Sequence, residues 1–211
     1  MYEPPLHKSE NLPELHALIR ERVFGLLISN GAGGLIANSV PFVLDASGSR
    51  LGVLKVHIAR ANPQWRELQE RPEALVVFQG HDHYITPSWY MTKRETGKVV
   101  PTWNYTMVQA RGRAKVMDEA WLERQVEELT RTLEVRRDQP WAVGDAPADF
   151  IRQQRQAIVG LEIEILDIKG KWKVSQNRPA ADRAGVVAGL EAMGDVESRA
   201  MAGIVREKSR D

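Results

Sequence analysis

The chain has 211 residues, which is enough for one well-packed core or for one domain with additional helices. It has no cysteine, and this excludes disulfides, thiolate nucleophiles and cysteine-based zinc sites. Its 29 Lys and Arg residues are balanced by 28 Asp and Glu, giving a formal net charge of +1. This balance excludes a strongly basic field for nucleic acid, although it leaves room for a local basic patch.

Nothing in the sequence predicts a membrane or an exported protein. No apolar run approaches the length of a membrane span, and the opening MYEPPLHKSE lacks the apolar region of a signal peptide. We therefore expect a cytoplasmic protein that has no membrane contact.

The first half of the chain predicts strands with two helices among them. Glycines at 30–34 allow the positive φ of a turn, and Pro41 suggests an edge or a bulge in its strand. Asn62 is a good helix cap and Pro63 a good first helical residue. The expected elements are a helix at 11–22, strands at 23–29, 35–44 and 51–58, a helix at 62–70 and a strand at 74–79.

The second half begins with an aromatic block and ends in helices. Residues 81–105 combine strand-like alternation with Trp89, Tyr90, Trp103 and Tyr105 beside two prolines. The block predicts either a surface for a flat ligand or partner or the core of an aromatic hairpin. The elements expected after the block are a strand at 106–117, a helix at 119–137, a loop at 140–147, a helix at 150–158, a strand or hairpin at 160–174 that would turn at Lys169-Gly170, and helices at 180–193 and 196–208.

This order of elements predicts the fold class. Short antiparallel strands with few helices between them favour a small β-barrel over a doubly wound parallel sheet. No GxGxxG motif follows a strand and opens a helix, so a Rossmann nucleotide site is not expected. We expect a mainly β, α+β protein: an antiparallel barrel with flanking helices and a helical C-terminal tail.

One candidate site lies where a strand gives way to a capped helix, in HIARANPQ at 57–64. Helix-terminal N–H groups suit a phosphate, and Arg60 can add a bidentate pair of hydrogen bonds. Lys55 and His57 are two residues apart on the preceding strand and so share a face. The alternative is that Asn62 only caps its helix and Arg60 is a surface charge.

A second candidate is the pair His81 and His83, which strand alternation places on one face, with His57 as a further ligand for a metal or haem. Hydrogen-bonded structural histidines are the alternative. Ser88 lies in TPSWY rather than in a GxSxG elbow, which argues against a hydrolase. DNA stays open as a partner: basic residues share one strand face, although no helix-turn-helix signature accompanies them. They are Arg111, Arg113 and Lys115.

Four motifs carry a resemblance to a known family: HIARANPQW at 57–65, YITPSWY at 84–90, GKVVPTWNY at 97–105 and KVSQN at 173–177. Together they resemble the PaiB family of FMN-binding, split-barrel negative transcriptional regulators, which are related in fold to pyridoxamine-phosphate oxidases. The resemblance runs from MYEPP to SQNR. It implies a homodimer of split barrels with FMN, or a similar phosphate-bearing flat ligand, at the subunit interface. Residues 1–178 would form the FMN-binding barrel, and residues 179–211 a helical tail packed on the same domain.

The resemblance also implies which residues contact the flavin. Arg60, Asn62 and Gln64 would face the phosphate, with Gln64 standing where the related oxidases commonly carry Lys. The remaining implied contacts are Lys55 and His57 lining the flavin, Ser39 and Val40 through their backbone, Trp103, Asn104 and Tyr105 from the partner subunit, and Ser88 and Trp89 closing the pocket.

Two other functions remain open on the sequence. An FMN-dependent oxidoreductase or flavin reductase would use the redox chemistry of the flavin itself, with His57, His83 or Tyr105 as candidate proton donors and no assigned catalytic residue. A haem- or metal-binding protein would use the histidines, by analogy with haem-handling proteins of the same fold.

Overall fold

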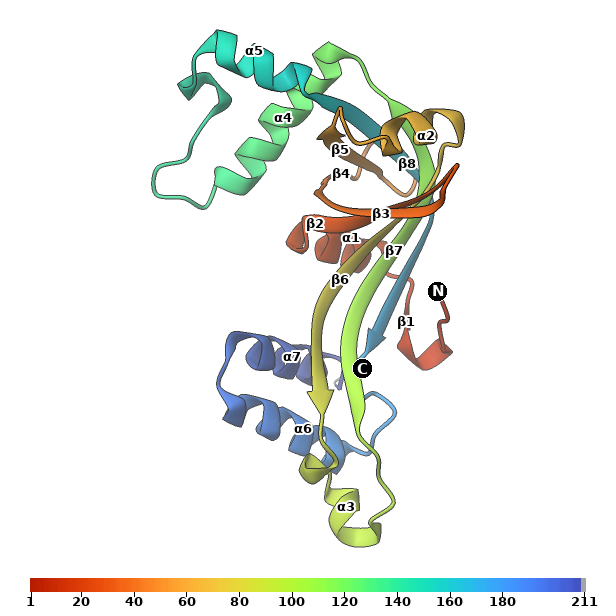
Figure 1. The fold of residues 1–211 in the computed structure, drawn as a ribbon. Coiled ribbons are helices and arrows are strands. Elements are labelled where there is room, and N and C mark those ends of the chain that lie inside the picture. Colours follow the sequence, from red (N-terminus) through yellow and green to blue (C-terminus); the bar gives the residue numbers. More distant parts are fainter. Residues whose placement is uncertain (210–211) are drawn as a thin grey trace. The chain divides into compact units, whose positions relative to one another are not determined.

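The structure, a computed structural model, describes residues 1–209 (Figure 1). Its framework is an eight-stranded sheet with the order β3-β2-β6-β7-β8-β5-β4, and β1 pairs with β8 outside this path. The strands are β1 (Lys8–Ser9), β2 (Phe24–Gly31), β3 (Gly34–Pro41), β4 (Val43–Asp45), β5 (Val53–Ala59), β6 (Glu73–Ile85), β7 (Thr102–Val116) and β8 (Ile158–Lys173).

Seven α-helices and three 3₁₀ turns accompany these strands among the described residues. The α-helices are α1 (Leu12–Glu21), α2 (Gln64–Glu70), α3 (Met91–Thr96), α4 (Glu119–Glu134), α5 (Ala148–Gln156), α6 (Ala180–Met193) and α7 (Val196–Glu207). The 3₁₀ turns are η1 (Pro5–His7), η2 (Pro87–Trp89) and η3 (Val143–Asp145). No helix within residues 1–209 is both long and apolar enough to cross a membrane.

The observed elements differ from the expected ones in several places. The strand expected at 35–44 is two strands, because β3 ends at Pro41, and the Phe42 N–H bonds to the Val23 carbonyl at 2.8 Å. Of the two alternatives expected at residues 160–174, the structure has the single long strand, β8. Strand β6 continues past residue 79 to Ile85. The short helix α3 was not expected; it ends at Gly97, whose φ of 69° allows the left-handed cap.

The chain forms two compact units. The barrel unit comprises Leu12–Phe78 and Gln109–Ile168, and the terminal unit comprises Met1–Asn11, Gln79–Val108 and the chain from Lys169 onward. Strands β6, β7 and β8 each contribute residues to both units. The division expected at residue 178 rests on the family resemblance and stays a prediction.

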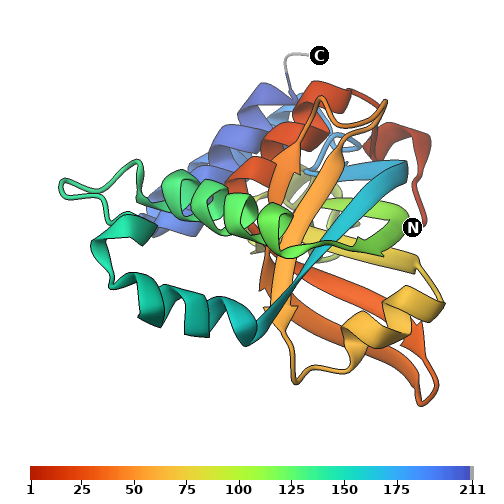
Figure 2. The same ribbon diagram turned by 90° about the horizontal axis from the view of Figure 1, so that it is seen from above.

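Strand alternation builds the core of the barrel unit. Along β2, Gly25, Leu27 and Ser29 are buried while their neighbours are more exposed. Helix α4 crosses the β4–β5 hairpin in Figure 2, where it is the green helix over the orange strands. Its buried face consists of Trp121, Leu122, Gln125 and Leu129. Leu122 and Leu129 belong to the apolar stripe that predicted this helix, whereas Leu133, also expected on that stripe, is exposed.

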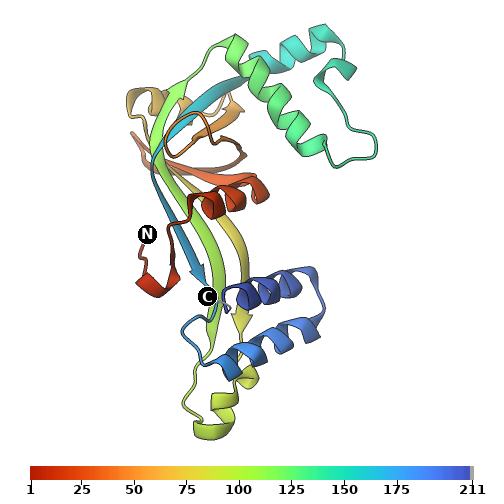
Figure 3. The ribbon, with the colours of Figure 1, turned by 180° about the vertical axis from the view of Figure 1, so that it is seen from behind.

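In the terminal unit, α6 and α7 form an antiparallel pair, drawn in blue in Figure 3. They join at Gly194, which has a φ of 78°. Helix α6 packs closely on Trp89. A Cβ atom added to Gly185 would lie 1.9 Å from the Trp89 carbonyl oxygen, and one added to Gly189 would lie 2.3 Å from the Trp89 ring. These two glycines are therefore required by close packing.

We predict that Gly185→Ala destabilises the protein by about 1–3 kcal/mol, because its methyl group meets backbone rather than a movable side chain. Gly203→Ala is the matched control: it lies in α7 with nothing within 4 Å of the added Cβ, so it should stabilise by about 0.5–1 kcal/mol. Urea unfolding followed by circular dichroism measures both. Equal stability of Gly185→Ala and the natural chain would contradict the packing argument.

Candidate functional site

The junction between β5 and α2 holds Arg60, and its guanidinium is fixed by backbone carbonyls. Nε donates to the Gln156 carbonyl at 2.7 Å and Nη2 donates to the Ile158 carbonyl at 2.9 Å. The Arg60 side chain is nevertheless exposed. A guanidinium carries five N–H donors, so donors remain for an anion at a preset position.

Gln64 is fully buried, and its amide is paired inside the barrel unit. Nε2 donates to Ser29 Oγ at 3.0 Å, and Oε1 accepts from Asn38 Nδ2 at 2.9 Å. Asn62 Oδ1 accepts from the Gln64 N–H at 3.0 Å, as expected of a capping side chain. The amide of Gln64 therefore links α2 to the sheet, a role that no pattern in the sequence predicts.

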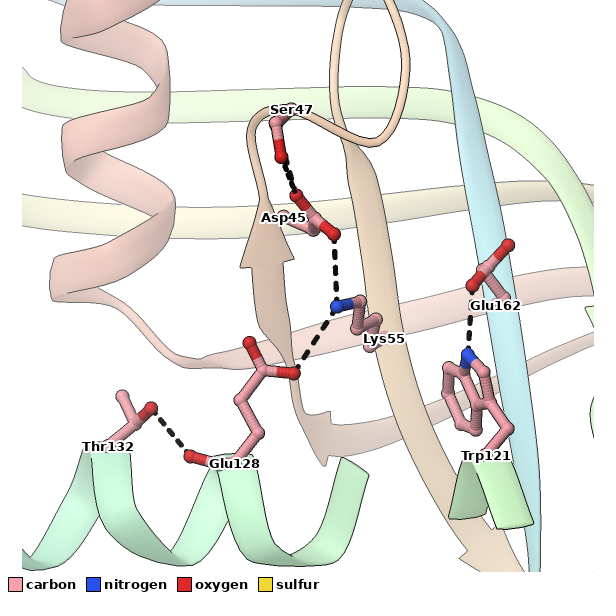
Figure 4. Close-up of polar contacts among 7 residues, drawn as sticks. All are labelled: Asp45, Ser47, Lys55, Trp121, Glu128, Thr132 and Glu162. Atoms are coloured by element: carbon pink, nitrogen blue, oxygen red, sulfur yellow. Dashed lines mark hydrogen bonds and ion pairs between the residues drawn. The ribbon is translucent and has the colours of Figure 1, made fainter. Parts of the chain in front are cut away.

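Lys55 and His57 share a face of β5, as expected, and this face meets α4. Lys55 Nζ lies 3.0 Å from Asp45 Oδ2 and 3.3 Å from Glu128 Oε2 (Figure 4). His57 Nδ1 lies 2.7 Å from Oε1 of Gln125. The same helix holds Trp121, whose indole N–H donates to Glu162 on β8 at 3.0 Å. Neither Gln125 nor Glu128 was predicted from the sequence, because their helix is distant in the chain.

The carboxylate of Asp45 is strongly stabilised. The Ser47 hydroxyl donates to Asp45 Oδ1 at 2.8 Å, and Lys55 adds a charged donor; together they lower the pKa of Asp45 from 3.8 to about 2. Burial opposes the charge on Lys55, but Asp45 and Glu128 outweigh it and raise the pKa of Lys55. Lys55 is thus a lysine with two carboxylate partners.

Ser39 and Val40 lie on β3, opposite Leu26 and Gly25 of β2. Because β3 is the first strand of the sheet order, the outer backbone edge of β3 is not hydrogen-bonded to another strand among residues 1–209. Backbone groups on such an edge are available for a ligand or a partner. This placement is compatible with the expected backbone contacts of Ser39 and Val40.

The terminal unit brings three of the four motifs together. Asn104 is buried and exchanges hydrogen bonds with Ser175, with Nδ2 3.0 Å from Ser175 Oγ. Ser175 has a φ of 68°, in the left-handed region that a residue other than glycine seldom adopts. The Trp103 ring, 54% exposed, meets Tyr84 edge-on at 6.2 Å between centroids. Asn104 is thus held within the unit, whereas Trp103 presents an open ring.

Trp89 and Ser88 lie in η2. The Trp89 ring packs against Gly189 of α6, and its centroid lies 6.3 Å from the His83 ring. Ser88 is exposed, and its Oγ accepts from Lys93 Nζ at 3.2 Å. Packing on α6 therefore holds the Trp89 ring without a ligand.

His81 and His83 contact the start of α7. His81 Nδ1 lies 2.7 Å from Glu197 Oε2, and His83 Nε2 lies 3.1 Å from Ser198 Oγ. Across residues 1–209, no three His, Asp or Glu side chains gather as a metal-binding group. The two imidazoles thus have hydrogen-bonded roles between β6 and α7.

Comparison with known proteins places the chain in a family. Residues 1–167 match the family described as "Putative FMN-binding domain". The chain is 30% identical over 208 residues to "Protease synthase and sporulation protein PAI 2" of Bacillus subtilis, covering 99% of this chain and 98% of that protein. It is 37% identical over 244 residues to an uncharacterized protein of Emericella nidulans, covering 99% and 97%.

The chain belongs to this FMN-binding domain family. Among solved structures it is similar to the FAD and heme binding protein from Mycobacterium smegmatis, with a TM-score of 0.60, 16% identity, and 79% of this chain and 73% of that one covered. It is also similar to the flavocytochrome Anf3 from Azotobacter vinelandii, with a TM-score of 0.57, 14% identity, and 78% and 68% covered. These likenesses, with the observed sheet, confirm the predicted fold: an antiparallel split barrel with flanking and C-terminal helices.

A flavin fits some of the predicted residues better than others. In the barrel unit, Arg60 offers open donors, and the Nε2 atom of Gln125 is buried beside His57 without a hydrogen-bond partner. An unpaired buried donor of this kind would gain from a ligand acceptor. Lys55 and Gln64 fit less well, because their polar atoms already have partners in the unit.

We predict a pH-dependent contribution of Asp45 to stability. Its folded-state pKa lies below its ordinary value, so the contribution is present above about pH 4 and is lost as the pH falls towards 2. Asp45→Asn should therefore be less stable than the natural chain at pH 6, and the difference should shrink between pH 4 and 2 in denaturant titrations. Ser47→Ala keeps the carboxylate but removes its main hydrogen-bond donor. The stability that Asp45 contributes should therefore be lost at a higher pH than in the natural chain. A difference independent of pH would contradict this explanation.

Proposed function

We propose that this chain is a homodimeric, cytoplasmic flavoprotein of the PaiB type that binds FMN and acts as a negative regulator of transcription. The observation that carries the proposal is similarity along the whole chain to the Bacillus subtilis protein, combined with the family match over residues 1–167. Because the similarity is not confined to one motif, the two proteins share an architecture throughout.

The phosphate contact is assigned to Arg60. Its guanidinium is exposed, while two of its N–H groups are fixed by carbonyls, so little side-chain entropy would be lost on binding an anion. Trp103, approaching from the partner subunit of the proposed dimer, is the residue best suited to contact a flat ring, since about half of its surface is open. The other proposed contacts to the flavin are Asn62, His57 and the β3 backbone at Ser39 and Val40. Weaker contacts are proposed for Tyr105, Ser88 and Trp89.

The structure does not favour haem or metal binding through the histidines, because His81 and His83 are hydrogen-bonded to residues of α7. An FMN-dependent oxidoreductase remains the alternative if the bound flavin is reduced by NADH or NADPH. Flavins carry their own redox chemistry, so this alternative needs no additional catalytic residue.

The purified protein should retain flavin absorbance after FMN is added and the excess is removed. Arg60→Ala should weaken FMN binding by about 1–3 kcal/mol while leaving riboflavin binding unchanged, because riboflavin lacks the phosphate. Titration calorimetry measures both ligands. Arg66→Ala is the matched control, since Arg66 is exposed nearby but stacks on Trp65 at 4.4 Å. Equal FMN affinity in the Arg60 variant and the natural chain would remove Arg60 from the site.

Direct repression requires DNA binding, and the exposed basic residues of β7 are the surface proposed for it. Arg111, Arg113 and Lys115 are exposed, whereas Gly112 and Ala114 between them are buried. Alternation therefore places three positive charges in a row on one outward face. Such a row suits the phosphates of a DNA backbone.

Gel-shift titrations at two salt concentrations should show weaker binding of a target promoter at the higher one, because counterions are released on binding. The double variant Arg111→Gln/Lys115→Gln should reduce the slope of log affinity against log salt by about 2. Lys98→Gln, an exposed lysine on another segment, should leave the slope unchanged. Absence of a shift even at low salt would argue against direct repression.

A further inference from the structure

Three lysines alternate along the end of β8 in the terminal unit: Lys169, Lys171 and Lys173. Strand alternation directs them to one face. Lys171 is only 8% exposed, and Lys173 is half-buried. Lysines are seldom so buried unless a carboxylate pairs with them.

Lys169 has such a partner, but within residues 1–209 the other two have only neutral ones. Lys169 Nζ lies 3.5 Å from Glu3 Oε2. Lys171 Nζ donates to the Tyr2 carbonyl at 3.1 Å and lies 5.4 Å from the centroids of the Tyr2 and Tyr105 rings. Lys173 Nζ donates to the Trp103 carbonyl at 2.7 Å and to the Thr102 hydroxyl.

The charges of these lysines affect the pKa of His7 and of Lys173 itself. Burial lowers the pKa of His7; its hydrogen bond with Gln176 opposes this, and the charges of Lys171 and Lys173 lower the pKa further. Burial likewise lowers the pKa of Lys173, and Lys171 and Arg178 add to the effect, against an opposing contribution from Tyr105. Lys171 and Arg178 thus lie close enough to Lys173 for their positive charges to repel one another in the terminal unit.

This arrangement contrasts with Lys55 of the barrel unit, which has two carboxylates within 3.3 Å. Carbonyls, a hydroxyl and ring faces stabilise an ammonium group but leave its full charge uncompensated. An anion would relieve the repulsion between Lys171 and Lys173 and would accept hydrogen bonds. Each ammonium has three N–H donors, and Lys173 uses two of them on the acceptors named above.

We propose that Lys171 and Lys173 form an anion-binding site that takes the phosphate or carboxylate group of a ligand. Lys173 is the principal contact, because it is the more accessible of the two lysines. The exposed ring of Trp103, whose carbonyl accepts from Lys173, offers a flat surface for an aromatic part of such a ligand. The proposal stands apart from flavin binding at Arg60, since it needs only an anion.

Inorganic phosphate is the first probe, used in titration calorimetry at constant ionic strength. Phosphate should bind the natural chain, and Lys173→Gln should weaken that binding about tenfold or more, because a charge-assisted contact is lost. Lys98→Gln, an exposed lysine of the same unit, is the matched control and should bind as the natural chain does. No phosphate binding, or equal affinity in the natural chain and Lys173→Gln, would overturn the proposal.

A labelling experiment avoids any folding defect of the variant. Acetic anhydride acylates uncharged amines, and the lowered pKa of Lys173 should make it react readily in the natural chain. Phosphate should slow acylation of Lys173 severalfold, relative to chloride at the same ionic strength, without slowing that of Lys98. Equal protection of the two lysines, or none, would overturn the site.

FMN and riboflavin identify the source of the anion. If Lys173→Gln weakens FMN binding but not riboflavin binding, the site takes the phosphate of the flavin. If the variant weakens only phosphate binding, the site takes a different anionic ligand. If the natural chain binds phosphate but no FMN, the proposed flavin function fails while the anion site stands.

Discussion

Strand alternation is the constraint on which both units depend. On β5, Val56 and Ile58 are buried in the core, and therefore Lys55 and His57 must point to the other face, where α4 meets them. On β7, the same rule buries Asn104 and places Trp103 on the outside. A shift of one residue in either strand would exchange core and surface, so the register also determines which polar groups can reach a ligand.

The two units differ in whether their buried or half-buried lysines are paired with carboxylates. Lys55 has two carboxylate partners, and the guanidinium of Arg60 is held by two carbonyls, so the barrel unit presents polar groups that are largely fixed before a ligand arrives. Lys171 and Lys173 have neutral partners only. The positive charge of the terminal unit therefore remains available to an anion, although the chain as a whole is nearly neutral.

Motifs that look alike in the sequence have different roles in the fold. Gln64 and Asn104 belong to motifs that suggested a flavin site, yet both are buried and bonded inside their own units. Arg60 and Trp103, from the same motifs, keep open groups. A motif therefore combines residues that hold the fold with residues that can touch a ligand, and burial separates the two kinds.

The sequence by itself determined the elements and their faces, because periodicity and capping act locally: α6 was predicted at its observed bounds, and α4 began where expected. It also determined the family, since four motifs in order specify it. Only the tertiary structure decided which polar groups are paired. Gln125 and Glu128 meet β5 from a helix some seventy residues away in the chain, and Tyr2 meets Lys171 from the opposite end. Such partners are chosen by packing between distant segments, which local sequence pattern does not encode.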